Sequence, residues 1–156
     1  MALQSSIGIG TPMLQVSEIF QMNFGLQVVM LYFVGLQTIY EITSSASYEL
    51  RFDLEDYDGN WKFAIYSNFK LGDASANYTL NYDVYTGNAE YRFATYDHDF
   101  NECSFPFSGA WWFNSCHNAN LNGLYGDTRF GKGLNWKQWH GFYYSLKTTE
   151  IKIRRM

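Results

Sequence analysis

The chain has 156 residues, of which 47% are hydrophobic and 20% aromatic, and its formal net charge at pH 7 is −4. This length fits one domain with a single packed core, which excludes a disordered chain. The scattered Lys and Arg residues provide no electrostatic footprint for nucleic acid. The longest apolar run, residues 28–35, is shorter than the roughly 18 to 20 residues that span a bilayer, and no signal peptide is visible. The sequence therefore predicts neither a nucleic acid nor a membrane partner.

The first expected elements are a helix over residues 16–22 and a β-hairpin further on. In residues 48–54, apolar side chains alternate with charged ones, as in a strand with one buried face. Asp58 and Gly59 supply a turn, and the alternation resumes over residues 61–69. The two runs together indicate a β-hairpin with a loop longer than two residues.

The second half of the chain is predicted to form mainly loops. A turn-rich stretch at 72–76 precedes a short strand over 78–85, which residues 86–88 close. From there to Trp136 we expect mostly loops. Residues 143–155 alternate again and predict a final strand that returns to the central sheet. No internal repeat or linker indicates a second domain.

Residues 109–126, with the sequence GAWWFNSCHNANLNGLYG, combine aromatic, Cys, His and Asn residues without a helical or strand period. Glycine and asparagine are the residues that turns recruit, so the segment predicts an ordered loop. Ordered loops of this length usually hold a functional site.

Asp97 and Asp99 are the first candidate ligands for a metal ion. Two carboxylates at positions i and i+2 of a tight loop can converge on one hard cation, and carbonyl oxygens can complete its shell. Taken alone the spacing is a weak signal, because acidic pairs in turns are more often simply solvated.

Cys103, Cys116 and His117 allow several interpretations. An even number of cysteines in a loop-rich chain indicates one disulfide, although two buried free thiols remain the alternative. Neighbouring Cys and His residues rarely form a nucleophile pair. A zinc site needs about four ligands from Cys, His or carboxylate side chains, and the chain has only three histidines. A hydrogen-bonded loop histidine is the simpler interpretation of His117. Asn77 opens an Asn-Tyr-Thr glycosylation sequon, which matters only in a secreted chain.

Three segments carry a resemblance to a known family: YELRFDLEDYDGNWKFAIYSNFKLG, the block at 109–126, and KGLNWKQWHGFYYSLKTTEIKIRR. Together they closely resemble fibrinogen-related domains of the ficolin and tachylectin kind. The resemblance implies an α+β fold with a central, mostly antiparallel sheet and long ordered loops that carry the binding site. It covers residues 20–156 as a partial domain and leaves residues 1–19 unmatched. The family's opening subdomain is not recognised, so the chain resembles an N-terminally truncated member.

The resemblance also implies a disulfide between Cys103 and Cys116 and a calcium site. Calcium would be held by the side chains of Asp97 and Asp99 and by backbone carbonyls at Asn101 and Cys103. The segment from Asp99 to Cys103 is shorter than in the family, and Glu102 replaces an asparagine. We therefore expect a calcium site whose binding the shorter loop either weakens or abolishes.

In the family, the histidine after the second cysteine lines a pocket for acetyl groups, and a cis peptide precedes that cysteine. Ser115-Cys116 would be this bond, at a cost of about 3 kcal/mol. The family's tyrosines are phenylalanines here, and glycine replaces the alanine at the pocket floor, which predicts a larger floor. The ligand-binding positions carried over are Phe107, Cys116, His117, Phe130, Gly131 and Phe142.

The resemblance thus implies a secreted, extracellular, non-catalytic lectin that binds acetylated glycans such as N-acetylglucosamine with calcium in innate recognition. Oligomers, expected of the full-length protein, would supply avidity, because one shallow pocket binds weakly. A protein-binding signalling or matrix module with a vestigial pocket is the main alternative, and a fragment that does not fold stably is a third. An enzyme is not expected, because the chain has no phosphate loop, nucleophile elbow or metalloprotease motif. Asp97 and Asp99 also lie too close together for a general acid and base acting across a bond.

Overall fold

The computed structural model describes residues 14–19, 35–83 and 91–156, the first segment as backbone only. Its elements, in chain order, are β1 (Leu14–Ile19), α1 (Leu36–Ser44), β2 (Tyr48–Glu55), β3 (Trp61–Tyr66), β4 (Lys70–Leu71), η1 (Ala74–Ala76), β5 (Leu80–Asn81), β6 (Phe93–Ala94), α2 (Ser104–Phe107), β7 (Trp111–Trp112), β8 (Ala119–Asn120), β9 (Asn135–Trp136), α3 (Lys137–His140) and β10 (Thr148–Arg155).

The main sheet has the strand order β1-β10-β2-β3, and neighbouring strands run antiparallel. Phe52 of β2 lies between Ile151 of β10 and Ala64 of β3 in the register. The predicted hairpin is confirmed as β2 and β3, although β3 ends at Tyr66. Three two-stranded pairs, β4-β5, β6-β7 and β8-β9, lie in the remaining described chain and are also antiparallel. The α+β class with a mostly antiparallel sheet is confirmed.

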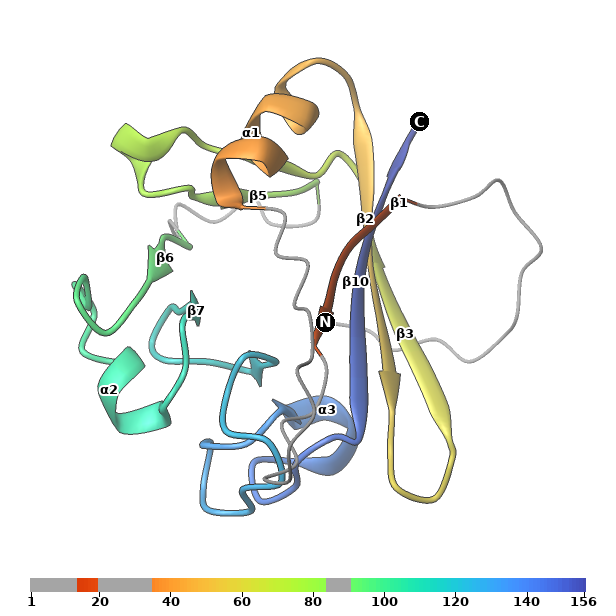
Figure 1. The fold of residues 1–156 in the computed structure, drawn as a ribbon, viewed down its shortest axis with the longest axis vertical. Helices are drawn as coiled ribbons and strands as arrows, with labels where there is room; N and C mark the ends of the chain where they lie inside the picture. Colours follow the sequence, from red (N-terminus) through yellow and green to blue (C-terminus); the bar gives the residue numbers. More distant parts are fainter. Residues whose placement is uncertain (1–13, 20–34, 84–90) are drawn as a thin grey trace, which may run out of the picture.

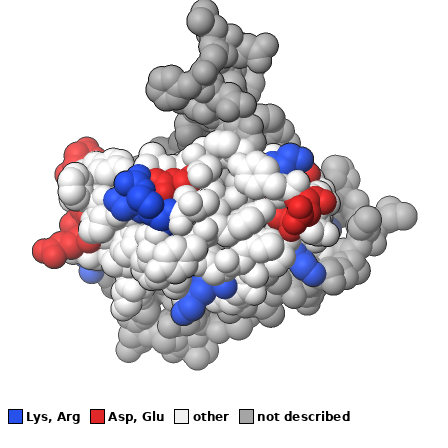
Figure 2. All heavy atoms as spheres, turned by 90° about the horizontal axis from the view of Figure 1, so that it is seen from below, with Lys and Arg blue, Asp and Glu red and all other residues white. Residues whose placement is uncertain are grey.

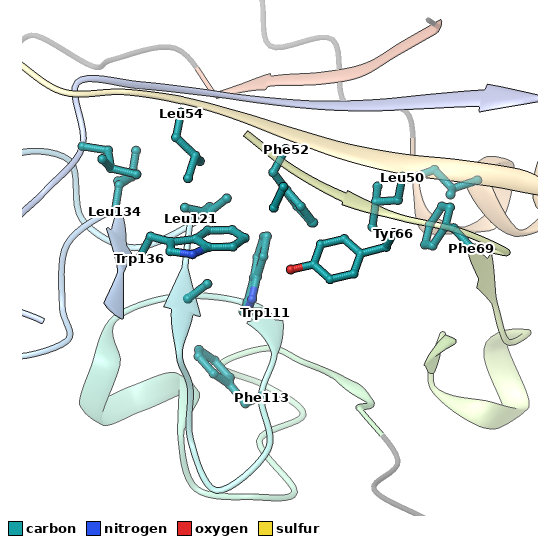
Figure 3. Close-up of a cluster of buried hydrophobic side chains, with 14 of the residues drawn as sticks. Leu50, Phe52, Leu54, Tyr66, Phe69, Trp111, Phe113, Leu121, Leu134 and Trp136 are labelled. Carbon is teal, nitrogen blue, oxygen red and sulfur yellow. The ribbon is translucent and has the colours of Figure 1, made fainter. Parts of the chain in front are cut away.

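The sheet stands along one side of the molecule, and the loops with α2 and α3 lie on the other (Figure 1). The core fills the space between these layers (Figure 3). At its centre, the ring of Phe52 lies with its centroid 6.0 Å from that of Tyr66, 6.2 Å from Trp111 and 5.7 Å from Trp136. Large rings contribute much of the buried apolar area. Phe52 and Tyr66 belong to the sheet, whereas Trp111 and Trp136 follow β6, so the packing of these rings anchors the later loops to the sheet.

The N-terminal helix predicted over residues 16–22 is wrong where it can be compared. Residues 14–19 form β1, which pairs with β10, and residues 20–22 lie outside the described part of the chain. Pairing with a neighbouring strand overrides weak local helix preference. Conversely, α1 was not predicted, although Ile39 and Thr43 are buried one turn apart on the same face.

Two predicted strands are shorter than expected. Of residues 78–85, only Leu80–Asn81 forms a strand within the described residues, because Tyr78 still belongs to the turn and has a φ of 48°. The final strand begins at Thr148 rather than at residue 143. Before it, the hydroxyl of Ser145 accepts hydrogen bonds from the amides of Gly126 and Leu134, which ties this segment to the loops instead of the sheet.

Figure 2 shows the end of the molecule near α3. There, the Lys, Arg, Asp and Glu side chains form separate islands among uncharged residues. Among the described residues, no helix is long and apolar enough to cross a membrane.

Candidate ligand-binding site

The predicted disulfide joins Cys103 and Cys116 across 13 residues, with their Cα atoms 5.3 Å apart. It connects the aspartate loop and the start of α2 to the residue that precedes His117. The described chain contains no cis peptide bond, so the cis bond expected between Ser115 and Cys116 is wrong. Instead, both residues adopt left-handed backbone, with φ values of 48° and 54°.

The predicted aromatic positions come together around His117. Its ring centroid lies 4.6 Å from that of Phe107 and 5.5 Å from that of Phe142, both nearly perpendicular to it. Phe130 packs 4.8 Å from Phe142 and 6.4 Å from Phe107. Phe113, which the sequence did not single out, closes another side at 5.7 Å. Three segments distant in sequence thus form one aromatic cluster, which we call the Phe-His cluster.

The floor of this cluster is not enlarged, contrary to the prediction made from glycine at position 131. A Cβ atom on Gly131 would lie 2.7 Å from Cδ1 of Phe107 and 3.0 Å from Cε1 of His117. The two rings therefore occupy the volume that an alanine methyl would fill. Gly131 also has a φ of 69°, a conformation that favours glycine.

Asn120 joins two walls of the Phe-His cluster through their backbones. Its side chain is fully buried in β8, and its Nδ2 donates to the carbonyls of Phe107 at 3.0 Å and Gly131 at 3.2 Å. The Gly131 amide in turn donates to the Phe142 carbonyl at 2.9 Å. These hydrogen bonds fix the segments that carry Phe107, Phe130 and Phe142 relative to one another.

His117 is a neutral, enclosed imidazole. Both ring nitrogens are buried, and neither has a hydrogen-bond partner of good geometry among the described residues. Burial lowers the pKa of His117 to about 4, although the neighbouring Asn135 side chain acts in the opposite direction. A neutral imidazole carries one N–H donor and one acceptor, so this site holds unsatisfied polar groups beside apolar rings.

The low pKa of His117 predicts a pH dependence of stability. Between about pH 6.5 and 4 the unfolded chain binds a proton at this residue that the folded chain does not. The free energy of unfolding should therefore fall as the pH drops through this window, with a slope of up to about 1.4 kcal/mol per pH unit. Urea unfolding between pH 5 and 7.5 measures it.

The variant His117→Gln should lose this contribution, and His98→Gln, at an exposed position, serves as the matched control. Identical pH profiles for wild type and His117→Gln would show that the histidine titrates normally in the folded protein.

The aspartate loop is held by the protein's own donors. Oδ1 and Oδ2 of Asp99 accept backbone N–H groups of Cys103 at 3.0 Å and Phe105 at 3.1 Å, so this carboxylate caps α2. Burial alone would raise the pKa of Asp99, but these amides and that of Ser104 hold it below its usual value. A charged cap at a helix start is favourable because it satisfies amides that lack helical partners.

The fit of calcium to this loop is partial. Asp97 is exposed and its Oδ1 accepts the Thr95 hydroxyl at 2.7 Å, while the Cys103 carbonyl already accepts the Phe107 amide. Among the described residues, no group of three or more His, Cys, Asp or Glu side chains that could hold a metal comes together. Calcium would have to share Asp99 with the helix cap and draw further oxygens from the Asn101 and Cys103 carbonyls.

The other predicted site residue, Asn77, is half-buried and directly follows η1 with a left-handed φ of 50°. Its glycosylation stays a prediction. His98 and His140 lie apart from the Phe-His cluster, since His98 packs on Phe100 and Nε2 of His140 lies 3.2 Å from Oδ2 of Asp56.

An antiparallel sheet that supports long, disulfide-braced loops with an aromatic cluster defines the class of fibrinogen-like globular domains. A model of the family described as "Fibrinogen beta and gamma chains, C-terminal globular domain" matches residues 14–156. The chain belongs to this family, as its resemblance implied.

Microfibril-associated glycoprotein 4 of Bos taurus is 41% identical over 145 residues, which cover 80% of this chain and 57% of that protein. Tenascin of Mus musculus is 38% identical over 135 residues, covering 79% of this chain and 6% of that protein. The fibrinogen-like globe domain of human ANGPTL6 superposes with a TM-score of 0.71 at 30% identity, covering 81% of this chain and 64% of that one. The chain therefore spans little more than half the length of the first curated relative.

Asn120, which bonds two segments of the cluster, and its register partner Asn135 were missed from the sequence. Both are fully buried and face each other in the β8-β9 register. A weak signal existed, because Asn135 stands between Leu134 and Trp136, and a polar residue inside an apolar run must find buried partners.

Proposed function

We propose that the chain is a non-catalytic recognition module that acts outside the cell and binds acetylated glycans, such as N-acetylglucosamine, at the Phe-His cluster. The observation that supports this most directly is the neutral His117, whose buried ring nitrogens lie beside apolar rings and have no well-placed hydrogen-bond partner among the described residues. An acetyl group combines a methyl for the rings with polar atoms for the imidazole. Binding sites for small ligands commonly pair an apolar lining with a few such polar groups.

Entry of the acetyl methyl requires the Phe107 ring to move. This ring and that of His117 occupy the space beside Gly131, so both must shift before a methyl can enter there. Phe107 is the last residue of the four-residue helix α2, and Ser108 after it has a left-handed φ of 54°.

Titration calorimetry of the oxidised, folded protein with N-acetylglucosamine tests this proposal. We expect saturable binding that falls at least tenfold in Phe142→Ala, because that variant removes a ring in contact with both His117 and Phe130. The variant Trp61→Ala, at an exposed aromatic residue of β3, should bind as the wild type does. Absence of binding by a folded sample would refute the proposal.

We also propose that the aspartate loop binds calcium through Asp97 and Asp99, with the carbonyls of Asn101 and Cys103. Carboxylates and carbonyls are the ligands that calcium prefers. Bound calcium would brace the start of α2, which carries Phe107, and would support the cluster through the disulfide. In innate recognition, oligomers of the whole protein would add avidity to each weak site.

Calcium should raise the thermal unfolding temperature, with a stabilisation of about 2.7 kcal/mol when its concentration is 100 times the dissociation constant. Asp97→Asn should abolish the shift without removing the cap that Asp99 supplies. Asp58→Asn, in the exposed β2-β3 turn, is the matched control. An equal shift in both variants, or none in the wild type, would count against a site at this loop.

A protein-binding module is the second candidate. It is supported by exposed rings near the cluster, since Phe105 is 79%, Tyr143 69% and Phe130 49% exposed. Large exposed apolar surfaces often mark protein contacts. A lamprey fibrin D-dimer with a TM-score of 0.70 and 29% identity was solved with the peptide Gly-His-Arg-Pro-amide, and its match covers 78% of this chain and 49% of that one. Binding of this peptide but not of the sugar would favour the second candidate.

A further inference from the structure

Strand β3 forms one edge of the main sheet, and within the described residues β2 is its only partner strand. Alternate backbone N–H and C=O groups of an edge strand point away from its partner. Natural proteins usually protect such an edge with a bulge, a proline or outward charges. The register of β3 on β2 runs without a shift, and β3 contains no proline. By contrast, β1 at the other edge has a register shift between Gln15 and Ser17.

The side chains that β3 places on the outer face of the sheet are all apolar. They are Trp61, Phe63 and Ile65, which we call the β3 stripe. Trp61 is 52% and Ile65 39% exposed. The guanidinium of Arg51 lies 4.3 Å from the centroid of the Phe63 ring and is held there by an ion pair with Asp53 at 2.6 Å. The β3 stripe is therefore an uncharged surface whose central ring is fixed in place.

The charges beside the β3 stripe are paired within the chain. Acidic residues of β2 pair with basic residues of β2, of β10 and of the segment before β10: Asp53 with Arg51 and Lys152, Glu55 with Lys147, and Glu49 with Arg154. This face therefore offers no excess of one sign that would select a charged partner. Two copies of it can lie edge to edge without strong repulsion, because each charge already has its counterion.

The sequence of β3 complements itself when two copies run antiparallel. With Phe63 on a two-fold axis, Phe63 faces its own copy and Trp61 faces Ile65 of the second copy. Aromatic and β-branched side chains are favourable cross-strand pairs. On the other face Lys62 lies opposite Ala64, so the two lysines do not meet. A two-fold interface requires this kind of self-complementarity.

We infer that two copies of this chain associate through β3, antiparallel and with Phe63 on the two-fold axis, so that their main sheets become one. This inference goes beyond the proposed sugar binding and does not depend on it. Residues of the same face lie opposite each other in this pairing, so the loop layers of both copies lie on the same side of the joined sheet. Because β3 and α2 lie on opposite sides of the molecule, the interface leaves Phe107 free in both copies (Figure 1).

Sedimentation velocity of the oxidised chain, between about 1 and 100 µM, tests the association. The wild type should shift toward twice the monomer mass as its concentration rises. Ile65→Glu should raise the dissociation constant of the dimer at least tenfold, because a carboxylate opposite Trp61 would lose its hydration. Phe105→Glu, at the 79% exposed residue of α2, is the matched control and should dimerise as the wild type does. Circular dichroism verifies that each variant is folded.

Cross-linking tests the register. Phe63→Cys should form a disulfide between two copies under mild oxidation, because residues directly opposite each other in an antiparallel pair have Cβ atoms about 4.5 to 5.5 Å apart. Trp61→Cys should not, since position 61 would face Ile65. The chain has no free cysteine that would compete. A wild type that stays monomeric, a dimer that Ile65→Glu leaves intact, or equal cross-linking of both cysteine variants would each overturn the inference.

Discussion

Replacing Cys103 and Cys116 together by alanine is expected to lower the free energy of unfolding by about 2 to 4 kcal/mol and to abolish binding of acetylated sugars. The disulfide spans 13 residues, and a closed loop of this size restricts the unfolded chain by about 3 kcal/mol. It also links the residue before α2 directly to the residue before His117. Without this link, the distance between Phe107 and His117 is less firmly fixed.

Urea unfolding of the oxidised wild type, the reduced wild type and the double variant measures the first effect. The reduced wild type is the matched control, because it keeps both side chains and loses only the S–S bond. Calorimetry under conditions where each sample is folded measures the second. Wild-type affinity in a destabilised but folded double variant would show that the disulfide serves stability alone.

The variant Gly131→Ala should destabilise the protein by about 1 to 3 kcal/mol and weaken sugar binding at least tenfold. Its Cβ would collide with the rings of Phe107 and His117, at 2.7 Å and 3.0 Å. The positive φ of Gly131 adds backbone strain to this collision. Alanine, the residue implied by the family, therefore does not suit this backbone.

The variant Gly126→Ala separates the effect of backbone strain from that of the collision with the rings. Gly126 has a φ of 71°, close to the 69° of Gly131, but a Cβ there would meet nothing within 4 Å. Its loss of stability therefore reports backbone strain alone, and the excess loss in Gly131→Ala reports the collision. Equal losses in both variants would mean that the rings yield freely, and stronger sugar binding by Gly131→Ala would mean that the methyl opens the cluster.

Local patterns predicted the sheet well wherever one face is buried. The alternation in residues 48–54 matches the burial of Leu50, Phe52 and Leu54 in β2. The strand over 14–19 could not be predicted, because it depends on pairing with β10 far along the chain. The strand predicted over residues 78–85 was too long for the opposite reason. Their alternation is genuine, but the carboxylate of Asp73 accepts the Ala76 amide and holds a turn that runs into Tyr78.

The side chains of the Phe-His cluster were predicted from the sequence, whereas the residue that supports their backbones was not. Phe107, His117, Phe130 and Phe142 meet as the resemblance implied. The closed floor at Gly131 could not be foreseen, because the position of the Phe107 ring depends on packing. The role of Asn120 was equally hidden, because it arises from the carbonyls of Phe107 and Gly131, which come close only after folding.

The bonds that Asn120 makes have a consequence for how such domains can diverge. They join backbone carbonyls, so the frame of the Phe-His cluster does not depend on which ring stands at position 107. Rings can be exchanged on this frame, as phenylalanine for tyrosine, without dismantling it. After gene duplication, copies of one domain can therefore drift toward different ligands through single substitutions while the fold stays under constant selection.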